Sequence, residues 1–216
     1  MLLRHGQTPW NVEHRFQGHS DIDLDVRGIE QAHLAAQALI HFDPALVVSS
    51  DLRRAAGTGA PLASAAELSL RTDARLRETD GGNWEGKLIA DLQDIDPVAW
   101  HAWRSGADIP AGQVGESRGE VGTRTAAAIT EYADRLEDDQ TLVVVTHGGA
   151  ANAAIGKLLG WPVEQWVSLG GLLNGHWAIL KAWTPASRQD SSGPQSAWRL
   201  AAYGVGPKAV AEQIRD

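Results

Sequence analysis

Two histidines lie far apart in the chain, and each of them follows a short apolar run. His5 stands after Arg4 in "LLRHGQTPWN", and His147 stands after "LVVVT". A neutral imidazole can act as a nucleophile or carry a proton, and an arginine guanidinium matches phosphate oxygens through paired hydrogen bonds. These residue types at the ends of apolar runs indicate a phosphate site in which His5 attacks phosphorus.

A third apolar run, "ALVVSS" at 45–50, precedes Arg53 and Arg54 at the start of an expected helix. The ligand crevice of an open parallel sheet lies beyond the carboxyl ends of its strands, so the three runs are expected to converge there. Free N–H groups at a helix N-terminus add to an anion site. Gly148, directly after the second histidine, would let the backbone approach a phosphoryl group closely.

Phosphoryl transfer also needs a proton donor for the leaving oxygen. The candidate is Glu78, in "RLRETDGGNWEG". Nearby arginines favour an ionised carboxylate, so an acid role requires an opposing desolvation. The other interpretation of Glu78 is a solvated ion pair with Arg75 or Arg77, in which case Asp80 and Glu85 are the substitute candidates.

The elements that must position these residues alternate between strand and helix. Aliphatic runs without polar alternation are typical of strands buried on both faces, and they occupy 1–3, 45–50 and 141–147. Helices are expected at 27–42, 53–68, 118–137 and 149–160. The alternation predicts an α/β fold with a mostly parallel sheet. The first run is shorter than the usual ~5–6 residues of a strand, which is compatible with a natural chain that begins a few residues upstream.

The domain organisation follows from length, since domains usually hold ~100–200 residues. One domain over 1–216 is predicted, with 88–112 as a small cap insertion of short helices over the site. The turn-rich segment "TPASRQDSSGPQS" at 184–196 is expected to be a flexible surface loop.

Charge and composition exclude several classes of protein. A net charge of −8 without clustered Lys and Arg argues against a nucleic-acid or anionic-membrane surface. The absence of cysteine excludes disulfides, cysteine-ligated zinc and cysteine-based phosphatase chemistry. No run approaches the ~18 apolar residues of a membrane span, and "RH" follows the third residue, which leaves no room for a secretory leader. A cytoplasmic protein is expected.

A metal or nucleotide cofactor is not predicted. Asp21, Asp23 and Asp25 alternate as in a calcium loop, but an EF-hand needs glycine at its sixth position and glutamate at its twelfth. Val26 and Ala32 stand there instead. The remaining histidines lack metal-ligand spacing, and "GGLLNG" lacks both the dinucleotide spacing and a preceding strand, so it is interpreted as a turn.

Five blocks together resemble the successive signatures of the histidine phosphatase superfamily, also known as phosphoglycerate-mutase-like. They are "LLRHGQTPWN", "SSDLRRAAGTG", "LRETDGGNWEG", "GES" and "VVVTHGG", in family order over residues 2–149. The resemblance implies a three-layer α/β/α sandwich and a phosphohistidine intermediate on His5. It further implies a small phosphorylated substrate and leaves open whether the chain forms a homodimer.

The same resemblance implies roles for individual residues. Arg4, Arg54 and His147 would hold the transferring phosphoryl, and Glu78 would protonate the leaving alkoxide. Two further residues, Asn11 and Gln17, would line the phosphate pocket. The family pattern reads Leu, any residue, Arg, Ala, two variable residues and Thr. This pattern fits residues 52–58 with Arg54 as its arginine, so Arg54 is chosen over Arg53. The arginines would keep His5 neutral and therefore nucleophilic.

A closer likeness within the family extends almost to the end of the chain. "PVEQWVSLGGLLNGHW" and "WRL" resemble the phosphatases that act on glucosyl-3-phosphoglycerate. A phosphoglycerate mutase and a catalytically silent protein that binds a phosphorylated metabolite are the alternatives. The segment after Glu78 is short for a cofactor-dependent mutase. Trp84, Trp100 and Trp103 are expected either to wall the pocket, where a sugar could stack on them, or to pack in the interior.

Overall fold

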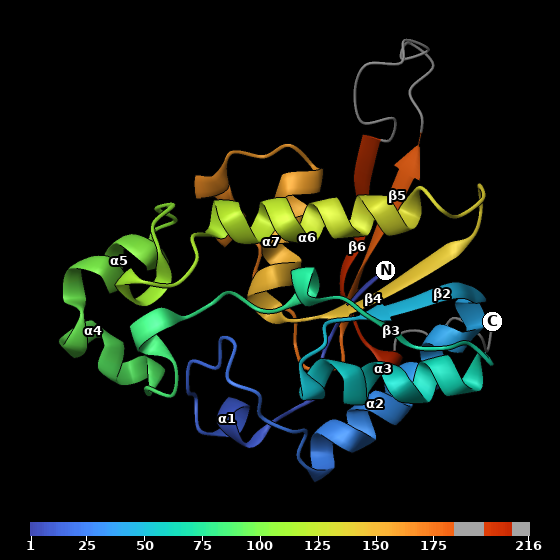
Figure 1. Cartoon of the computed structure of the whole chain (residues 1–216), viewed down its shortest axis with the longest axis horizontal. Helices are drawn as coiled ribbons and strands as arrows, with labels where there is room; N and C mark the ends of the chain where they lie inside the picture. The colour runs from blue at the N-terminus through green and yellow to red at the C-terminus, as the bar shows by residue number, and fades with distance from the viewer. Residues whose placement is uncertain (184–196, 209–216) are drawn as a thin grey trace.

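A six-stranded sheet runs through the middle of the protein in the computed structural model, which describes residues 1–183 and 197–208 (Figure 1). Its strands are β1 Leu2–Arg4, β2 Pro44–Ser49, β3 Arg71–Thr72, β4 Thr141–Thr146, β5 Trp177–Trp183 and β6 Ala197–Val205. The strand order is β3-β2-β4-β1-β5-β6. The first four are paired in parallel, and β5 is antiparallel to both of its neighbours. The turn-rich loop expected at 184–196 lies outside the described residues.

Helices cover both faces of the sheet (Figure 1). On one face α2 (Val26–Leu39) packs against α3 (Arg53–Ala65), and on the other α6 (Arg118–Ala133) packs against α7 (Gly148–Leu158). The remaining helices are short: α1 Pro9–Val12, α4 Leu92–Ile95, α5 Pro97–Arg104, and the 3-10 helices η1 Ile40–Phe42, η2 Ala74–Leu76, η3 Gly82–Trp84, η4 Ile89–Asp91, η5 Ala111–Gln113 and η6 Val163–Ser168. The expected three-layer sandwich with a mostly parallel sheet is confirmed.

The central strands are buried on both faces, which explains their unbroken apolar runs. Successive side chains on a strand point to opposite faces. Leu3, Val143 and Val145 therefore pack with α2 and α3. Leu2 and Val144 pack with α6 and α7. Because β1 and β4 are neighbours in the sheet, these two strands carry the centre of both hydrophobic layers.

Side chains cap the starts of α1, α2 and α6 but not those of α3 and α7, and α6 ends earlier than expected. Ser117 and Glu120 form a capping box at the start of α6, at the predicted boundary. The prediction of a helix over 118–137 was too long, because α6 ends at Ala133. Leu136 lies beyond that end but still packs against the core, so the apolar spacing continues past the helix.

Three of the six strands escaped the sequence analysis. β3 has only two residues, both exposed. β5 and β6 form an antiparallel edge pair whose residues are mostly half-buried or exposed. Trp177 at the start of β5 is buried, whereas Lys181 and Trp183 near its end are exposed. Partly solvated edge strands of this kind lack the continuous aliphatic run that identified the central strands.

The segment 88–112 contains η4, α4, α5 and the first residues of η5, and it packs around a small separate cluster. The ring of Trp84 lies at the centre of this cluster, with ring centroids 5.4 Å from Trp100 and 5.7 Å from Trp103. Only 1% of Trp84 is exposed, so this tryptophan packs in the interior rather than walling a pocket. The function of the segment as a cap stays a prediction.

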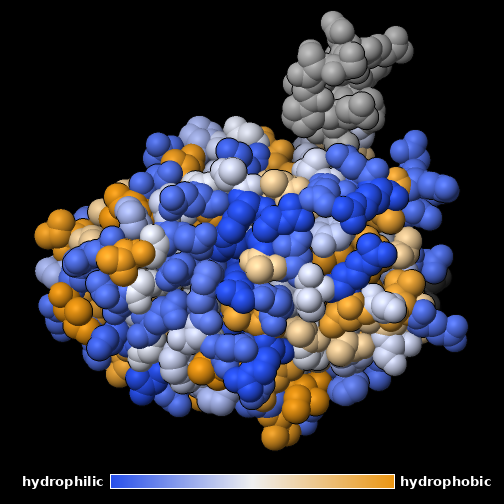
Figure 2. Space-filling model, in the orientation of Figure 1, coloured by the Kyte–Doolittle hydropathy of each residue, from blue (hydrophilic) through white to orange (hydrophobic). Residues whose placement is uncertain are grey.

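The polar character of the surface agrees with the content of charged residues in the sequence, which is 21%. The face in Figure 2 is mostly hydrophilic, with hydrophobic residues scattered between the polar ones, as is normal for a protein surface. No helix within the described residues is long and apolar enough to cross a membrane. We propose that 1–216 form one domain, because one sheet joins strands from both ends of the described chain.

Candidate active site

The two histidines that follow β1 and β4 lie side by side. The centroids of the His5 and His147 rings are 5.1 Å apart, with the ring planes at 60°. The parallel pairing of Arg4 with Thr146 places the two strand ends at the same level, and the amide of His5 donates to the carbonyl of Thr146 at 3.0 Å. Both rings are almost completely buried. The sheet thus joins residues that are 142 positions apart (147 − 5).

The hydrogen bonds of His5 leave its Nε2 available for attack. Its Nδ1 lies 2.7 Å from the carbonyl oxygen of Gly6. A carbonyl only accepts, so Nδ1 carries the proton and Nε2 keeps the lone pair. Gly6 itself packs directly against the backbone of Gly28 at the start of α2, where a Cβ atom would collide. The turn that follows the nucleophile is therefore held by close backbone packing.

Arg54 connects the two sides of the site. Its Nε donates to Nδ1 of His147 at 3.2 Å, and its terminal nitrogens donate to the carbonyls of Gly18 and Ser20, both at 2.8 Å. Because Nδ1 of His147 accepts, its Nε2 carries a proton, and that atom lies 2.9 Å from Oγ of Ser50. His147 therefore donates its Nε2–H to Ser50, so both ring nitrogens are held while the ring lies beside His5.

Arg4 contributes a second guanidinium. One terminal nitrogen donates to the carbonyl of Leu172, while the buried Nε has no acceptor among the described residues. A Cβ atom at Gly148 would lie 3.5 Å from this guanidinium, so glycine leaves the approach to it open. A buried N–H without an acceptor is costly unless a ligand supplies one, and a phosphoryl oxygen would do so.

Arg53 points away from this site. It is exposed and forms ion pairs with Asp21 at 3.1 Å and Asp23 at 2.8 Å. Asp25 accepts from the amide of Gly28 and caps α2. The alternating aspartates thus serve ion pairing and helix capping. Among residues 1–183 and 197–208, no group of three His, Cys, Asp or Glu side chains could hold a metal ion.

Burial and the arginines keep both histidines neutral. Desolvation, followed by the charges of Arg54 and Arg4, holds the pKa of His5 well below 6.5. The pKa of His147 is lowered in the same way, by desolvation first and then by Arg54 and His5. A neutral His5 is the nucleophilic form, so the site is prepared for attack on phosphorus.

Glu78 lies at the N-terminus of α7. Its carboxylate accepts from the amides of Gly149 at 3.0 Å and Ala150 at 2.9 Å. The interpretation of Glu78 as the ion-pair partner of Arg75 or Arg77 was wrong. Arg75 binds Asp73 and Glu131, and Arg77 binds Asp51, each at 2.6 to 2.7 Å.

The two substitute acids are engaged elsewhere. Glu85 accepts from the amides of His19, Ser20 and Gly81. Asp80 accepts from the amide of Gly82. Neither lines the cavity that contains His5, whereas Glu78 does. Glu78 is therefore the carboxylate that can reach a ligand there.

A cavity of about 510 Å³ leads to His5. The predicted residues that line it are Arg4, His5, Asn11, Gln17, Arg54 and Glu78, whereas His147 and Gly148 are not among its lining residues. The amide oxygen of Gln17 accepts from Thr8, and that of Asn11 accepts from Thr8 and Asn174. Their NH₂ groups are thus the ends left to bind a ligand oxygen.

Several residues of the site escaped the sequence analysis. Asn174, in the segment interpreted only as a turn, donates to the carbonyls of His5 and Gly6 at 3.0 and 3.2 Å. Asn152 and Arg118 line the cavity. The sequence offered only an indirect signal for Asn174, because the turn "LLNGH" immediately precedes β5, the strand next to β1.

Comparisons with known proteins identify the class. Residues 1–187 match the model of the Histidine phosphatase superfamily (branch 1), and the chain belongs to this family. It is accordingly a hydrolase of the phosphatase type.

Individual relatives narrow the likeness. Glucosyl-3-phosphoglycerate phosphatase of Mycobacterium tuberculosis (strain ATCC 25618 / H37Rv) is 41% identical over 209 residues, which cover 93% of this chain and 91% of the relative. A probable phosphoglycerate mutase of Yersinia pestis (strain Pestoides F) is 38% identical over 76% of this chain and 75% of its own. The solved structure of mycobacterial glucosyl-3-phosphoglycerate phosphatase with VO3 superposes with a TM-score of 0.85, at 37% identity over 95% of this chain and 98% of that one.

The two buried neutral histidines predict a loss of stability in mild acid. Unfolded histidine has a pKa of about 6.5, and the folded pKa values of His5 and His147 lie well below it, so unfolding takes up protons below that pH. Stability should fall as pH drops from 6.5 toward 4.5, by about 1.4 kcal/mol per pH unit for each proton taken up. Urea unfolding at pH 8, 6.5 and 5 measures this.

A variant separates the histidines from other groups. Carboxylates with a lowered pKa, such as Asp51 and Glu116, lose their contribution at still lower pH. His147→Gln should reduce the fall between pH 6.5 and 5, whereas exchange of the exposed His33 should leave it unchanged. A midpoint that is constant over this range would contradict the burial of two neutral imidazoles.

Proposed function

We propose that the protein hydrolyses a small phosphate monoester through a phosphohistidine on His5, with glucosyl-3-phosphoglycerate as the preferred substrate. The observation that carries the proposal is the pair of neutral imidazoles, 5.1 Å apart, of which His5 lines the cavity together with Arg4 and Arg54. The likeness to glucosyl-3-phosphoglycerate phosphatases supports the choice of substrate.

The reaction proceeds in two transfers. Nε2 of His5 attacks phosphorus, the bond to the ester oxygen breaks, and Glu78 donates a proton to the departing alkoxide. Water then attacks the phosphohistidine while the Glu78 carboxylate takes its proton, which releases phosphate and restores His5. Arg4 and Arg54 stabilise the charge on the phosphoryl oxygens in both transfers, and the ring of His147 packs beside the nucleophile.

The outer part of the cavity offers groups for the rest of the substrate. The guanidinium of Arg118 stacks on the ring of Trp103, 3.8 Å from its centroid, and donates to the carbonyl of Ala107 at 3.3 Å. Burial lowers the pKa of Arg118 to about 10, so the group stays charged at neutral pH. This cation suits the carboxylate of a glycerate. The neighbouring ring of Trp100, which also lines the cavity, suits a sugar.

A substrate panel tests the proposal. Phosphate release should be fastest with glucosyl-3-phosphoglycerate, slower with 3-phosphoglycerate and slowest with glucose phosphates, which lack the carboxylate. Equal rates for all three, or a faster glucose phosphate, would contradict the choice of substrate. A probable phosphoglycerate mutase is also similar to the chain, so the products from 3-phosphoglycerate should be analysed. Isomer formation without phosphate release would favour the mutase.

The setting of this activity is also proposed. We place it in the cytoplasm, in line with the apolar runs of the sequence, which are all short. Assembly as a homodimer stays a prediction, and sedimentation of the purified protein measures it.

A further inference from the structure

The proposed acid lies on a stretch of chain without regular structure. Glu78 stands between η2, which ends at Leu76, and η3, which begins at Gly82. A helix or strand fixes a side chain through its own backbone hydrogen bonds, but this stretch has no such ladder. Its position must therefore come from groups elsewhere in the fold.

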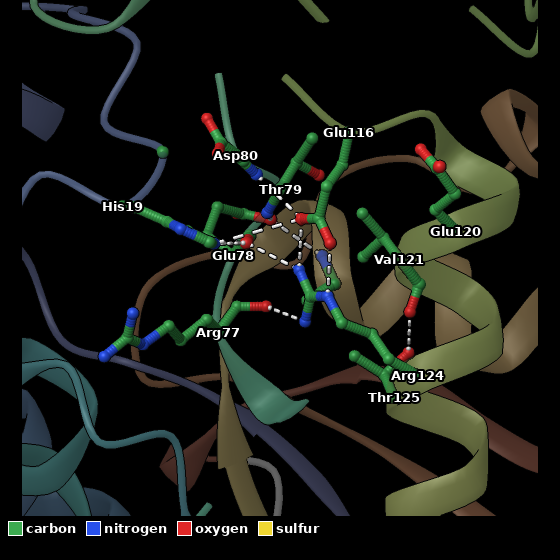
Figure 3. A network of polar contacts seen from close by, with 12 residues as sticks. His19, Arg77, Glu78, Thr79, Asp80, Glu116, Glu120, Val121, Arg124 and Thr125 are labelled. Atoms are coloured by element: carbon green, nitrogen blue, oxygen red, sulfur yellow. Dashed lines mark hydrogen bonds and ion pairs between the residues drawn. The ribbon is translucent and has the colours of Figure 1, made fainter. Parts of the chain in front are cut away.

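Arg124 on α6 supplies most of these contacts (Figure 3). One terminal nitrogen donates to the carbonyls of Arg75 and Arg77, and the other donates to the carbonyl of Glu78, all at 2.8 Å. The Nε and the second terminal nitrogen also donate to the carboxylate of Glu116 at 2.7 Å. All five N–H groups of the guanidinium are thus used, three of them on the backbone that leads to the acid.

Glu116 holds the chain on the other side of the acid. Its Oε2 accepts from the amide of Asp80 at 2.9 Å, and its own amide donates to the carbonyl of Asp80 at 3.0 Å. Nε2 of His19 lies 2.9 Å from the carbonyl of Glu78, which already accepts from Arg124. The backbone of Glu78 is therefore held from both directions, while its carboxylate rests on α7.

The pair that makes these contacts is ionised. Burial alone would raise the pKa of Glu116, but hydrogen bonds from Arg124 and Asp80 hold it below its usual value. Neither Arg124 nor Glu116 lines the cavity that contains His5. Their contacts therefore act on the acid through its backbone rather than on a substrate.

We infer that Arg124 and Glu116 are positioning residues for proton donation by Glu78 to the leaving oxygen. The inference rests on the proposed mechanism. Glu116, in the "GES" block, and Arg124, eight positions later, thus support the general acid and do not bind phosphate. A displaced acid should slow esters whose alkoxide needs a proton, and it should spare esters whose leaving group departs without one.

Leaving-group dependence tests this assignment. Arg124→Lys keeps the charge but cannot form the five-donor fork, and Glu116→Gln removes the ionic acceptor. The test compares kcat/KM for 3-phosphoglycerate, an alkoxide ester, with kcat/KM for p-nitrophenyl phosphate, because this ratio reports on steps up to release of the alcohol. We expect losses of about 10- to 100-fold on the alkoxide ester, because a displaced acid loses only a share of the ~10²- to 10⁴-fold that general acid catalysis contributes, and less than about threefold on the nitrophenyl ester.

Controls separate positioning from damage to the fold. Arg135→Lys changes an exposed arginine that pairs with Glu131 and lies over the ring of Tyr132 near the end of α6, and it should leave both rates unchanged. Equal losses on both esters in the Arg124 and Glu116 variants, or no loss on either, would overturn the inference. If the wild-type protein hydrolyses both esters but not glucosyl-3-phosphoglycerate, the proposed substrate fails, whereas the ratio of the two esters still tests the positioning residues.

Discussion

Exchange of His5 for alanine is expected to abolish hydrolysis of every phosphate ester. The imidazole Nε2 is the atom that forms the bond to phosphorus. The other imidazole nearby, His147, cannot replace it, because Arg54 and Ser50 hold its two ring nitrogens. Loss of the nucleophile from a catalytic unit typically lowers kcat by about 10⁴-fold or more. Phosphate release from p-nitrophenyl phosphate measures this loss, since even this reactive ester requires the attack.

The fold should survive this change. His5 contributes one side-chain hydrogen bond, to the carbonyl of Gly6, and the backbone of the strand end stays paired through Thr146. Circular dichroism and the unfolding midpoint report on the fold, and His33→Ala on the exposed side of α2 is the matched control. Protein quenched in alkali, where the N–P bond of a phosphohistidine is stable, should carry labelled phosphate in the control and none in His5→Ala. Turnover by His5→Ala above about 1% of the wild-type rate would exclude a phosphohistidine on this residue.

Exchange of Arg54 for methionine should lower kcat by about 10³-fold or more. An arginine that stabilises a transferring phosphoryl contributes about 10³ to 10⁵ in rate. In this protein Arg54 also donates to Nδ1 of His147, so its loss removes the contact that fixes the tautomer in which Nε2–H donates to Ser50. The carbonyls of Gly18 and Ser20 lose their donors as well, and a lower unfolding midpoint should accompany the lost activity.

The neighbouring arginine provides a matched control. Arg53→Met removes the same charge one position earlier, but its partners Asp21 and Asp23 are exposed, so activity should change less than about twofold. Exposed ion pairs of this type contribute at most about 1 kcal/mol to stability. An Arg53→Met variant that loses as much activity as Arg54→Met would show that the two guanidinium groups had been assigned in the wrong order.

Sequence patterns predicted the parts of the site that follow strands. The strands before His5 and His147 could be recognised from their apolar runs because both are buried on both faces. Their convergence could be predicted because parallel strands bring their carboxyl ends to one edge of the sheet. The choice of Arg54 over Arg53 came from the spacing of Leu52, Ala55 and Thr58. The structure gives it a physical basis, since Ala55 and Thr58 share the buried face of α3 with Arg54.

Other parts of the site depend on contacts that spacing does not encode. Asn174 reaches His5 only because β5 lies next to β1, and this half-buried edge of the sheet carries a weak sequence signal. The carboxylate of Glu78 meets α7 because two segments 71 positions apart pack together. In the sequence Arg118 is an ordinary residue in the first turn of α6, and nothing there indicates that its guanidinium stacks on Trp103.

The central place of β1 in the sheet determines when a growing chain can become active. Leu2 pairs with Val144 on one side and with Ala178 on the other, so the first strand made on the ribosome waits for partners made much later. Until then its edges are unprotected, and distant pairings of this kind slow folding and favour association between nascent chains. The two halves of the phosphate site therefore meet only late in synthesis.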